Sequence, residues 1–128
     1  MNDDSSKKTL ALISHDGKKA DMVAFAIANR DVLARYHLVA TATTGGLIES
    51  KANLKVTKLL SGPHGGDAQI AAQIAEGKIA AVFFFLDPLG KHPHDPDIQS
   101  LLRICNVHNV PLATNAATAQ FIISQQAL

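Results

Sequence analysis

Residues 79–86 read IAAVFFFL, an unbroken apolar run in which β-branched and aromatic side chains are frequent. The run has the length of a strand, and its lack of polar residues indicates a strand that is covered on both faces. Further apolar runs occur at 9–14 (TLALIS), 36–41 (YHLVAT), 55–60 (KVTKLL) and 110–114 (VPLAT). These five stretches predict the strands of a sheet.

Helical periodicity fills several of the intervening stretches. Residues 96–106 (PDIQSLLRICN) have apolar residues at helical spacing. Asp95, which comes directly before them, is the predicted N-cap, and a proline occupies the first helical position. Helices are also expected over 18–33 and 67–76. The residues predicted to face the sheet are Ile98, Leu101, Leu102 and Cys105 in the first helix, Met22, Val23, Ala26, Ile27 and Leu33 in the second, and Ile70 and Ile74 in the third.

The alternation of strand and helix, repeated about five times, predicts an α/β fold with three α/β/α layers. Right-handed crossovers place the helices on both faces of a parallel five-stranded sheet. At 128 residues, with 47% hydrophobic residues, the chain has the length and composition of one domain spanning 1–128. Residues 1–7 are expected to form a loose leader.

Charge and cysteine content narrow the classes of function. The formal net charge is +1, which gives no electrostatic argument for a nucleic-acid partner. Cys105 is the only cysteine, so we expect a reducing compartment, the cytoplasm, and a buried structural thiol. No stretch approaches the roughly 20 apolar residues needed to cross a bilayer, so no membrane association is expected.

Polar segments follow all five predicted strands. They are 15–19 (HDGKK), 41–46 (TATTGG), 61–67 (SGPHGGD), 87–97 (DPLGKHPHDPD) and 114–118 (TNAAT). In an open parallel sheet, ligands bind at the carboxyl ends of the strands. The sequence therefore predicts a binding site along this edge.

Segments 41–46 and 61–67 combine glycine with small hydroxyl residues ahead of helices. Free backbone N–H groups and the positive end of a helix dipole suit a phosphate there. Neither segment has the spacing of a P-loop or a dinucleotide site, which favours a small phosphorylated ligand. For either segment alone, helix caps and turns are the favoured explanation. Two such segments at the predicted ligand edge, with lysine and histidine beside them, favour a phosphate site. The groups predicted to hold the phosphate are Thr41, Thr43, Thr44, Ser61 and, as a point charge, Lys19.

Each of the acidic residues has a possible structural role as well as a catalytic one. Asp67 is either a carboxylate favoured by a helix N-terminus or a general base beside the phosphate site. Asp87 is also a turn former before Pro88, and Asp97 can serve the helix dipole. The stretch HPHDPD at 92–97 is not favoured as a metal site, because two prolines interrupt it and it lacks a helical histidine pair.

The segments HDGKK, ATATTG, SGPHGGDAQI, DPLGKHPHDPD and PLATN, in this order, resemble the methylglyoxal synthase family over about residues 9–124. The resemblance implies a Rossmann-like fold and conversion of dihydroxyacetone phosphate to methylglyoxal and inorganic phosphate. It also implies no cofactor, a homohexamer, and inhibition by inorganic phosphate. Two positions depart from or vary within the family pattern: Ala42 stands where members usually have glycine, and His64 occupies a variable position.

The resemblance also implies roles for individual residues. Asp67 becomes the catalytic base and His94 a contact to the substrate oxygens, with Asp97 in the catalytic group and Asp16 and Asp87 as supporting acidic residues. The residues placed around the substrate, chiefly its phosphate, are His15, Lys19, Thr41, Ala42, Thr43, Thr44, Ser61, Gly62 and His94.

These residue types suit an elimination through an enediolate. A carboxylate removes a proton beside the ketone, neutral donors stabilise the developing oxyanion, and the phosphate leaves from the neighbouring carbon. The alternative is a module of the same fold that binds a phosphorylated ligand without catalysis and needs neither Asp67 nor His94. Isomerisation of the same substrate is a second enzymatic alternative.

Overall fold

The structure, a computed structural model, describes residues 7–90 and 98–124. Within these residues the strands form a single sheet with the order β3-β2-β1-β4-β5, and all neighbours pair in parallel. The strands are β1 (Thr9–Ser14), β2 (His37–Ala40), β3 (Thr57–Lys58), β4 (Ala81–Phe85) and β5 (Leu112–Ala113).

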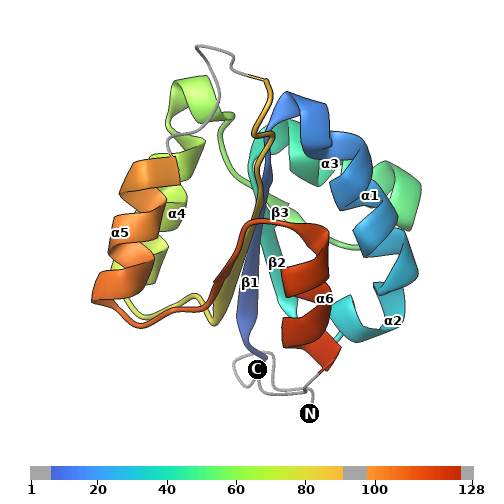
Figure 1. Ribbon diagram of the computed structural model, residues 1–128. Coiled ribbons are helices and arrows are strands. Elements are labelled where there is room, and N and C mark those ends of the chain that lie inside the picture. The colour runs from blue at the N-terminus through green and yellow to red at the C-terminus, as the bar shows by residue number, and fades with distance from the viewer. Residues whose placement is uncertain (1–6, 91–97, 125–128) are drawn as a thin grey trace.

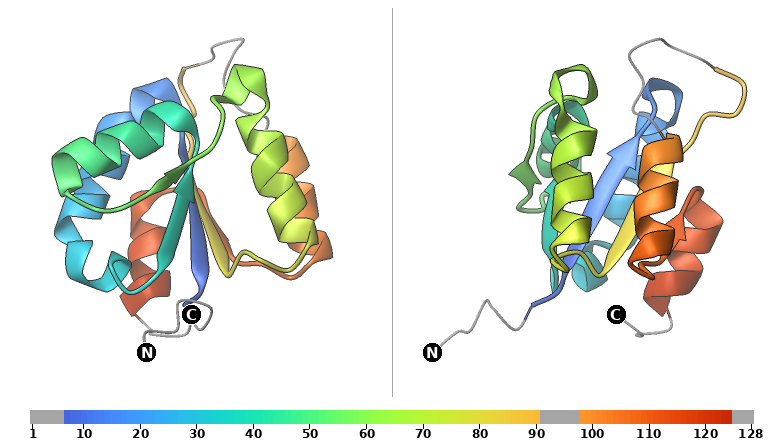
Figure 2. Two further views of the ribbon diagram at one scale, coloured as in Figure 1. Left: turned by 180° about the vertical axis from the view of Figure 1, so that it is seen from behind. Right: turned by 90° about the vertical axis from the view of Figure 1, so that its left-hand side faces the viewer.

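Helices cover both faces of this sheet (Figure 1). One face carries α1 (Lys19–Ala28), α3 (Ala42–Ala52) and α6 (Ala116–Ser124), and the other carries α4 (Gly66–Ala75) and α5 (Ile98–Val107). The short helix α2 (Arg30–Leu33) and two 3-10 turns, Asp16–Lys18 and Gly62–His64, complete the elements. Figure 2 shows the same two layers of helices, one on each side of the sheet, from other directions. The predicted three-layer α/β/α fold is confirmed.

Alternate side chains of the strands fill two separate cores. Phe83 and Phe85 of β4 pack toward α1, where both rings belong to one cluster with Phe25, while Phe84 points to the α4 and α5 side. All three β4 phenylalanines are fully or almost fully buried. Residues 79–86 are continuously apolar because they contain a central strand that helices cover on both faces of the sheet.

The edge strand β3 departs from the expectation for 55–60. Only Thr57 and Lys58 pair with β2, and both are exposed. Leu54 and Val56 are buried just before the strand. The Lys58 ammonium pairs with Glu49 of α3, and the Val56 N–H also donates to that carboxylate, at 3.2 Å. The Lys58 hydrogen bond, followed by the Val56 N–H, lowers the pKa of Glu49.

The helix expected over 18–33 is interrupted at Asn29. The Asn29 side-chain amide donates to the Phe25 carbonyl at 2.9 Å and to Oε1 of Gln120 at 2.8 Å. Asn29 thus occupies a carbonyl at the end of α1 and ties this helix to α6. Residues 30–33 continue as α2, and its Leu33 is buried as predicted.

Two residues predicted to face the sheet do not. Ile27 is 53% exposed and Leu102 is 40% exposed. Phe25 and Ile104 point inward from the same helices, and Phe25 is the larger side chain. Adjacent apolar positions in a helix cannot all face the sheet, and the rotation of the helix about its own axis decides which of them do; spacing alone does not fix that rotation. Ile70, Ile74, Leu101 and Cys105 are buried as predicted.

We expect Cys105 to resist alkylation in the folded chain. Burial raises the pKa of its thiol from 9.0 to about 11, which reduces the thiolate fraction about a hundredfold at mildly alkaline pH. Alkylation followed by mass spectrometry should be at least about a hundredfold slower in buffer than in denaturant. Equal rates in the two conditions would contradict the assignment of Cys105 to the core.

The strand order indicates where a ligand is expected to bind in this fold. The chain runs from β1 outward to β2 and β3, then returns to the other side of β1 for β4 and β5. Strand order reverses between β1 and β4, and ligands in open α/β sheets bind outside the carboxyl ends of the strands at such a point. The segments after β1 and β4, beginning at His15 and Asp87, therefore border the expected site.

Candidate active site

The structure brings four of the predicted polar segments together at the carboxyl edge of the sheet. Ser14 Oγ lies 3.0 Å from Thr44 Oγ1, which joins the ends of β1 and β2. A Cβ added at Gly66 would lie 3.0 Å from Thr41 Cγ2, so the segment after β3 touches the one after β2. The Asp87 N–H reaches the ring of His15 and links the β4 and β1 ends. These contacts span residues far apart in sequence.

Segment 41–46 is the first turn of a helix rather than a loop. Thr41 is the N-cap of α3, with extended backbone, and Ala42, Thr43 and Thr44 are its first three helical residues. Thr43 is exposed, while Thr41 and Thr44 are buried. The N-terminal N–H groups and the dipole of α3 consequently point toward the carboxyl edge, as a phosphate requires.

Ala42 is accommodated without backbone strain. It lies in helical conformation, and the non-glycine residues with positive φ in the described chain are Asn53 and Asn109. The position that is usually glycine in the family therefore does not require a positive φ in this chain.

The Thr44 hydroxyl serves the interior of the protein, where it contacts Ser14. Replacing Thr44 by valine keeps the shape of the side chain and leaves the buried Ser14 hydroxyl without that partner. We expect the free energy of unfolding to fall by about 1–3 kcal/mol, measured by chemical denaturation. The matched substitution Thr43→Val, at an exposed position of the same turn, should change it by less than about 0.5 kcal/mol. Equal losses in both variants would contradict the structural role of Thr44.

Segment 61–66 is a closed turn held by its own backbone. The Ser61 carbonyl accepts N–H groups from His64 at 3.0 Å and from Gly66 at 2.9 Å. Gly65 has φ of 103°, a conformation that favours glycine. A Cβ at Gly66 would lie 1.9 Å from the Leu60 carbonyl oxygen, so only glycine fits there. The Leu60 N–H is held in turn by Oε1 of Gln69, at 2.8 Å.

The turn delivers Asp67 into the first turn of α4, where its side chain is half-buried. The start of a helix favours a carboxylate, and partial burial keeps part of the group from water. Ser61, at the other end of the turn, has its Oγ 2.7 Å from Nδ1 of His64. The two ends of one short segment thus present a hydroxyl and a carboxylate.

His15 is the most firmly placed of the predicted site residues. Its backbone N–H donates to the Phe85 carbonyl at 3.1 Å and extends the pairing of β1 with β4 by one residue. Its ring Nδ1 accepts the Asp87 N–H at 3.0 Å. The ring also meets Phe84 edge-on, with centroids 5.3 Å apart. Backbone, imidazole and aromatic contacts together fix its orientation.

Asp87 organises the turn after β4 with its side chain. Oδ1 accepts the N–H groups of Leu89 and Gly90, each at 3.1 Å. If Gly17 carried a Cβ, that atom would lie only 2.1 Å from Oδ2 of Asp87. The interpretation of Asp87 as a turn former is confirmed, and its carboxylate also packs against the segment after β1.

Lys19 lies at the start of α1, with its side chain partly buried. Its ammonium pairs with Oδ1 of Asp16 at 2.7 Å and lies 3.4 Å from the Ser14 carbonyl oxygen. Asp16 therefore holds the lysine close to the end of β1. The pair lies on the same segment as His15, which keeps a positive charge at the predicted phosphate site.

His94 and Asp97, together with the HPHDPD stretch, lie outside the described residues. Within residues 7–90 and 98–124, no three histidine, cysteine or carboxylate side chains come close enough to hold a metal ion. In the same part of the chain no helix is both long and apolar enough to span a membrane.

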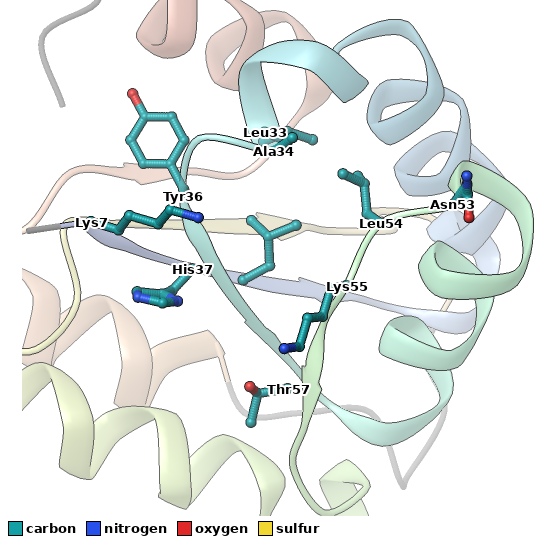
Figure 3. Close-up of a pocket in the computed structure, with 10 residues that line it drawn as sticks. Lys7, Leu33, Ala34, Tyr36, His37, Asn53, Leu54, Lys55 and Thr57 are labelled. Atoms are coloured by element: carbon teal, nitrogen blue, oxygen red, sulfur yellow. The ribbon is translucent and has the colours of Figure 1, made fainter. Parts of the chain in front are cut away.

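A cavity of about 250 Å³ at the opposite end of the sheet contains none of the predicted site residues (Figure 3). Its lining includes Lys7 and Lys55 beside Asn53, the residue at which α3 ends. Its lining residues lie at the amino ends of the strands, away from the carboxyl edge where the predicted segments meet.

Sequence reasoning missed three residues that hold the site together. Ser14 appeared only as the last residue of a strand, Gln69 only as a helical residue, and Gly17 only as part of HDGKK. Each acts through a partner distant in sequence: Thr44, Leu60 and Asp87, respectively. Their polarity or small size was visible in the sequence, but the partner was not.

A parallel α/β/α fold with glycine- and hydroxyl-rich segments gathered at its carboxyl edge is the arrangement of an MGS-like domain, and the model of that family matches residues 21–114. Relatives named methylglyoxal synthase include one from Thermus thermophilus, 57% identical over 117 residues that cover 91% of this chain and 93% of the relative. Another, from Cupriavidus metallidurans, is 55% identical over 122 residues, with 95% and 87% covered. The chain belongs to the methylglyoxal synthase family.

A solved structure supports the same assignment. The crystal structure of methylglyoxal synthase from Elizabethkingia anophelis NUHP1 superposes with a TM-score of 0.90 and 44% sequence identity. The match covers 92% of this chain and 78% of that one. The agreement extends over almost the whole described fold, including both helical layers.

Proposed function

We propose that the chain is a carbon–oxygen lyase that converts dihydroxyacetone phosphate to methylglyoxal and inorganic phosphate through an enediolate. The observation that carries the proposal is the short closed turn at 61–67. It presents the Ser61 hydroxyl and the Asp67 carboxylate from one rigid piece of backbone. The identity of 57% to a methylglyoxal synthase over 91% of the chain supports it.

In this reaction Asp67 takes the proton from the carbon that bears the hydroxyl group. Electrons move toward the ketone oxygen, and the enediolate then expels the phosphate from the carbon on the other side. As the C–O bond to phosphate breaks, the hydroxyl on the deprotonated carbon gives up its proton and becomes the aldehyde, while the ketone oxygen takes up a proton to give the enol of methylglyoxal. The proton on Asp67 passes to the departing phosphate or to water, which restores the carboxylate, and the enol rearranges to methylglyoxal after release. A positioned base contributes about 10²–10⁴-fold to such a proton transfer. His94 is proposed to donate to the ketone oxygen, where negative charge develops.

The phosphate is proposed to lie between the starts of two helices. Thr41, Thr43 and the N–H groups of α3 face it from one side, and Ser61 and Gly62 from another. Lys19, held by Asp16, supplies a positive charge. Because phosphate and base attach to the same turn, the reacting carbon stays at a fixed distance from Asp67. The phosphate C–O bond must also stand out of the enediolate plane for elimination.

The proposal extends to the setting of the enzyme. We place it in the cytoplasm, as a homohexamer, with inorganic phosphate as an inhibitor and without a cofactor. Phosphate is the leaving group of the reaction, so a site built to hold it in the substrate also binds it free. Exposed apolar residues on the outer surface, including Ile27 and Phe121, are compatible with subunit contacts.

The test is incubation of the purified chain with dihydroxyacetone phosphate, with methylglyoxal and inorganic phosphate measured in the same samples. Equal appearance of the two products is expected. Glyceraldehyde 3-phosphate without phosphate release would instead identify an isomerase. Binding of the substrate with no product at all would favour the non-catalytic sensing module.

A further inference from the structure

The ring of His15 lies between two groups that leave it little freedom. The Asp87 N–H points at Nδ1 from 3.0 Å, and Phe84 meets the ring at an interplanar angle of 87°. His15 is also anchored by its own backbone N–H to Phe85. The ring is therefore held by the strand ends and not by the substrate.

The contact with Asp87 determines where the proton of the ring resides. A backbone N–H can only donate, so Nδ1 must offer its lone pair, and the proton of the neutral ring is then on Nε2. In a doubly protonated ring the N–H at Nδ1 would point at the Asp87 N–H, and the hydrogen bond between them would be lost. We infer that His15 is held as the neutral Nε2–H tautomer and donates that single N–H to the phosphate of the substrate. The inference rests on the proposed phosphate site.

The charged groups around His15 do not replace this bond. Asp87 contacts the ring through its main chain, while its carboxylate turns away to the N–H groups of Leu89 and Gly90. Asp16, Lys18 and Lys19 follow on the same segment; Asp16 is paired with Lys19 and Lys18 with Asp21.

The neutral form has a chemical consequence. A neutral imidazole is a very weak acid at Nε2, so it can hold a phosphate oxygen without giving up its proton. The same bond then persists from bound substrate to released phosphate, and proton transfer remains with Asp67 and His94. His15 would thus bind and orient the phosphate while taking no part in acid–base chemistry.

Gly17 is a positioning residue for this arrangement. The Asp87 carboxylate occupies the space beside Gly17, since an added Cβ would lie 2.1 Å from Oδ2. A larger residue at position 17 would displace the Asp87 carboxylate, which also accepts the N–H groups of Leu89 and Gly90. Gly17 therefore leaves room for the side chain of the residue whose N–H holds the His15 ring.

The first test is the protonation pattern of the ring in the full chain near neutral pH. In a ¹⁵N-labelled sample, His15 signals are those missing from the spectrum of His15→Asn. One protonated nitrogen assigned to Nε2, with an unprotonated Nδ1, is expected. A proton on Nδ1, alone or together with one on Nε2, would overturn the inference. This measurement requires no turnover.

The second test separates the two nitrogens with a pair of variants. In His15→Asn the amide can place an acceptor near the position of Nδ1, but the donor at the position of Nε2 is removed. In His15→Gln the amide places a donor near the position of Nε2. Calorimetric titration with inorganic phosphate should show affinity reduced about tenfold or more in His15→Asn and within about threefold of the natural chain in His15→Gln. The thermal midpoint should fall more in His15→Gln, which loses the Asp87 contact.

The control is His108→Asn, at an exposed histidine just after α5, which should leave phosphate affinity unchanged. Equal loss of affinity in both His15 variants would overturn the donor role. If the natural chain binds phosphate with this variant pattern but does not turn over dihydroxyacetone phosphate, the lyase proposal fails and the role of His15 stands.

Discussion

Replacement of Asp67 by asparagine is expected to lower turnover of dihydroxyacetone phosphate by about 10²–10⁴-fold. Asparagine keeps the size and hydrogen-bonding reach of the side chain at the start of α4, but it cannot accept a proton from carbon. The affinity for inorganic phosphate should rise or stay within a few-fold, because a negative charge near the phosphate is removed. Release of inorganic phosphate from the substrate measures the first effect, and calorimetry the second.

The matched control is Glu76→Gln, a carboxylate lost at the other end of the same helix. Glu76 is exposed and lies opposite the carboxyl edge of the sheet. Its variant should retain turnover within about twofold, because removing an exposed charge far from the reacting groups has little effect. Turnover in Asp67→Asn that equals the natural chain would remove Asp67 from the role of base. A parallel collapse of the thermal midpoint would indicate misfolding instead, which circular dichroism detects.

Gly66→Ala is expected to lower both stability and activity. The added methyl would lie 1.9 Å from the Leu60 carbonyl oxygen and 2.8 Å from the Leu60 carbonyl carbon. These are backbone atoms, so relief requires movement of the chain and not of a flexible side chain. We expect a loss of about 1–3 kcal/mol or more in the free energy of unfolding. The displacement also moves Asp67 and Ser61 relative to each other, so turnover should fall further than stability explains.

Gly46→Ala is the control for this substitution. Gly46 lies inside α3, and an added Cβ there meets no atom within 4 Å. Alanine in a helix interior is favoured over glycine by about 0.5–1 kcal/mol, so this variant should be slightly more stable. Urea unfolding of the two variants side by side gives opposite signs. A Gly66→Ala chain as stable as the natural one would show that the turn at 61–66 can relax.

The architecture was predictable because the central strands can be recognised from their local sequence. The runs at 9–14 and 79–86 carry enough β-branched and aromatic residues to be recognised without knowledge of their neighbours. The helix beginning at Ala42 was harder, because its first turn consists of threonine and glycine, which are poor helix formers. Its start depends on packing of Ile48 and Ala52 against the sheet, a tertiary effect.

The candidate site was predictable in its location but not in its internal bonds. That polar segments meet at one edge follows from parallel pairing alone. That Nδ1 of His15 accepts from Asp87, or that Ser14 reaches Thr44, depends on which strands are neighbours and in what register. Sequence spacing carries no information on those pairings. The role of Gly17 was hidden for the same reason, because the carboxylate it makes room for belongs to a distant segment of the chain.

The turn between Ser61 and Gly66 has a bearing on which substrates the chain can select. Its length is set by two hydrogen bonds to one carbonyl, so the span from the Ser61 hydroxyl to the Asp67 carboxylate cannot stretch to suit the ligand. In a phosphorylated ketone with one additional carbon before the acidic C–H, either the phosphate or that carbon would be out of place. The backbone of the turn would thus discriminate by chain length, a task that other enzymes assign to the depth of a side-chain pocket.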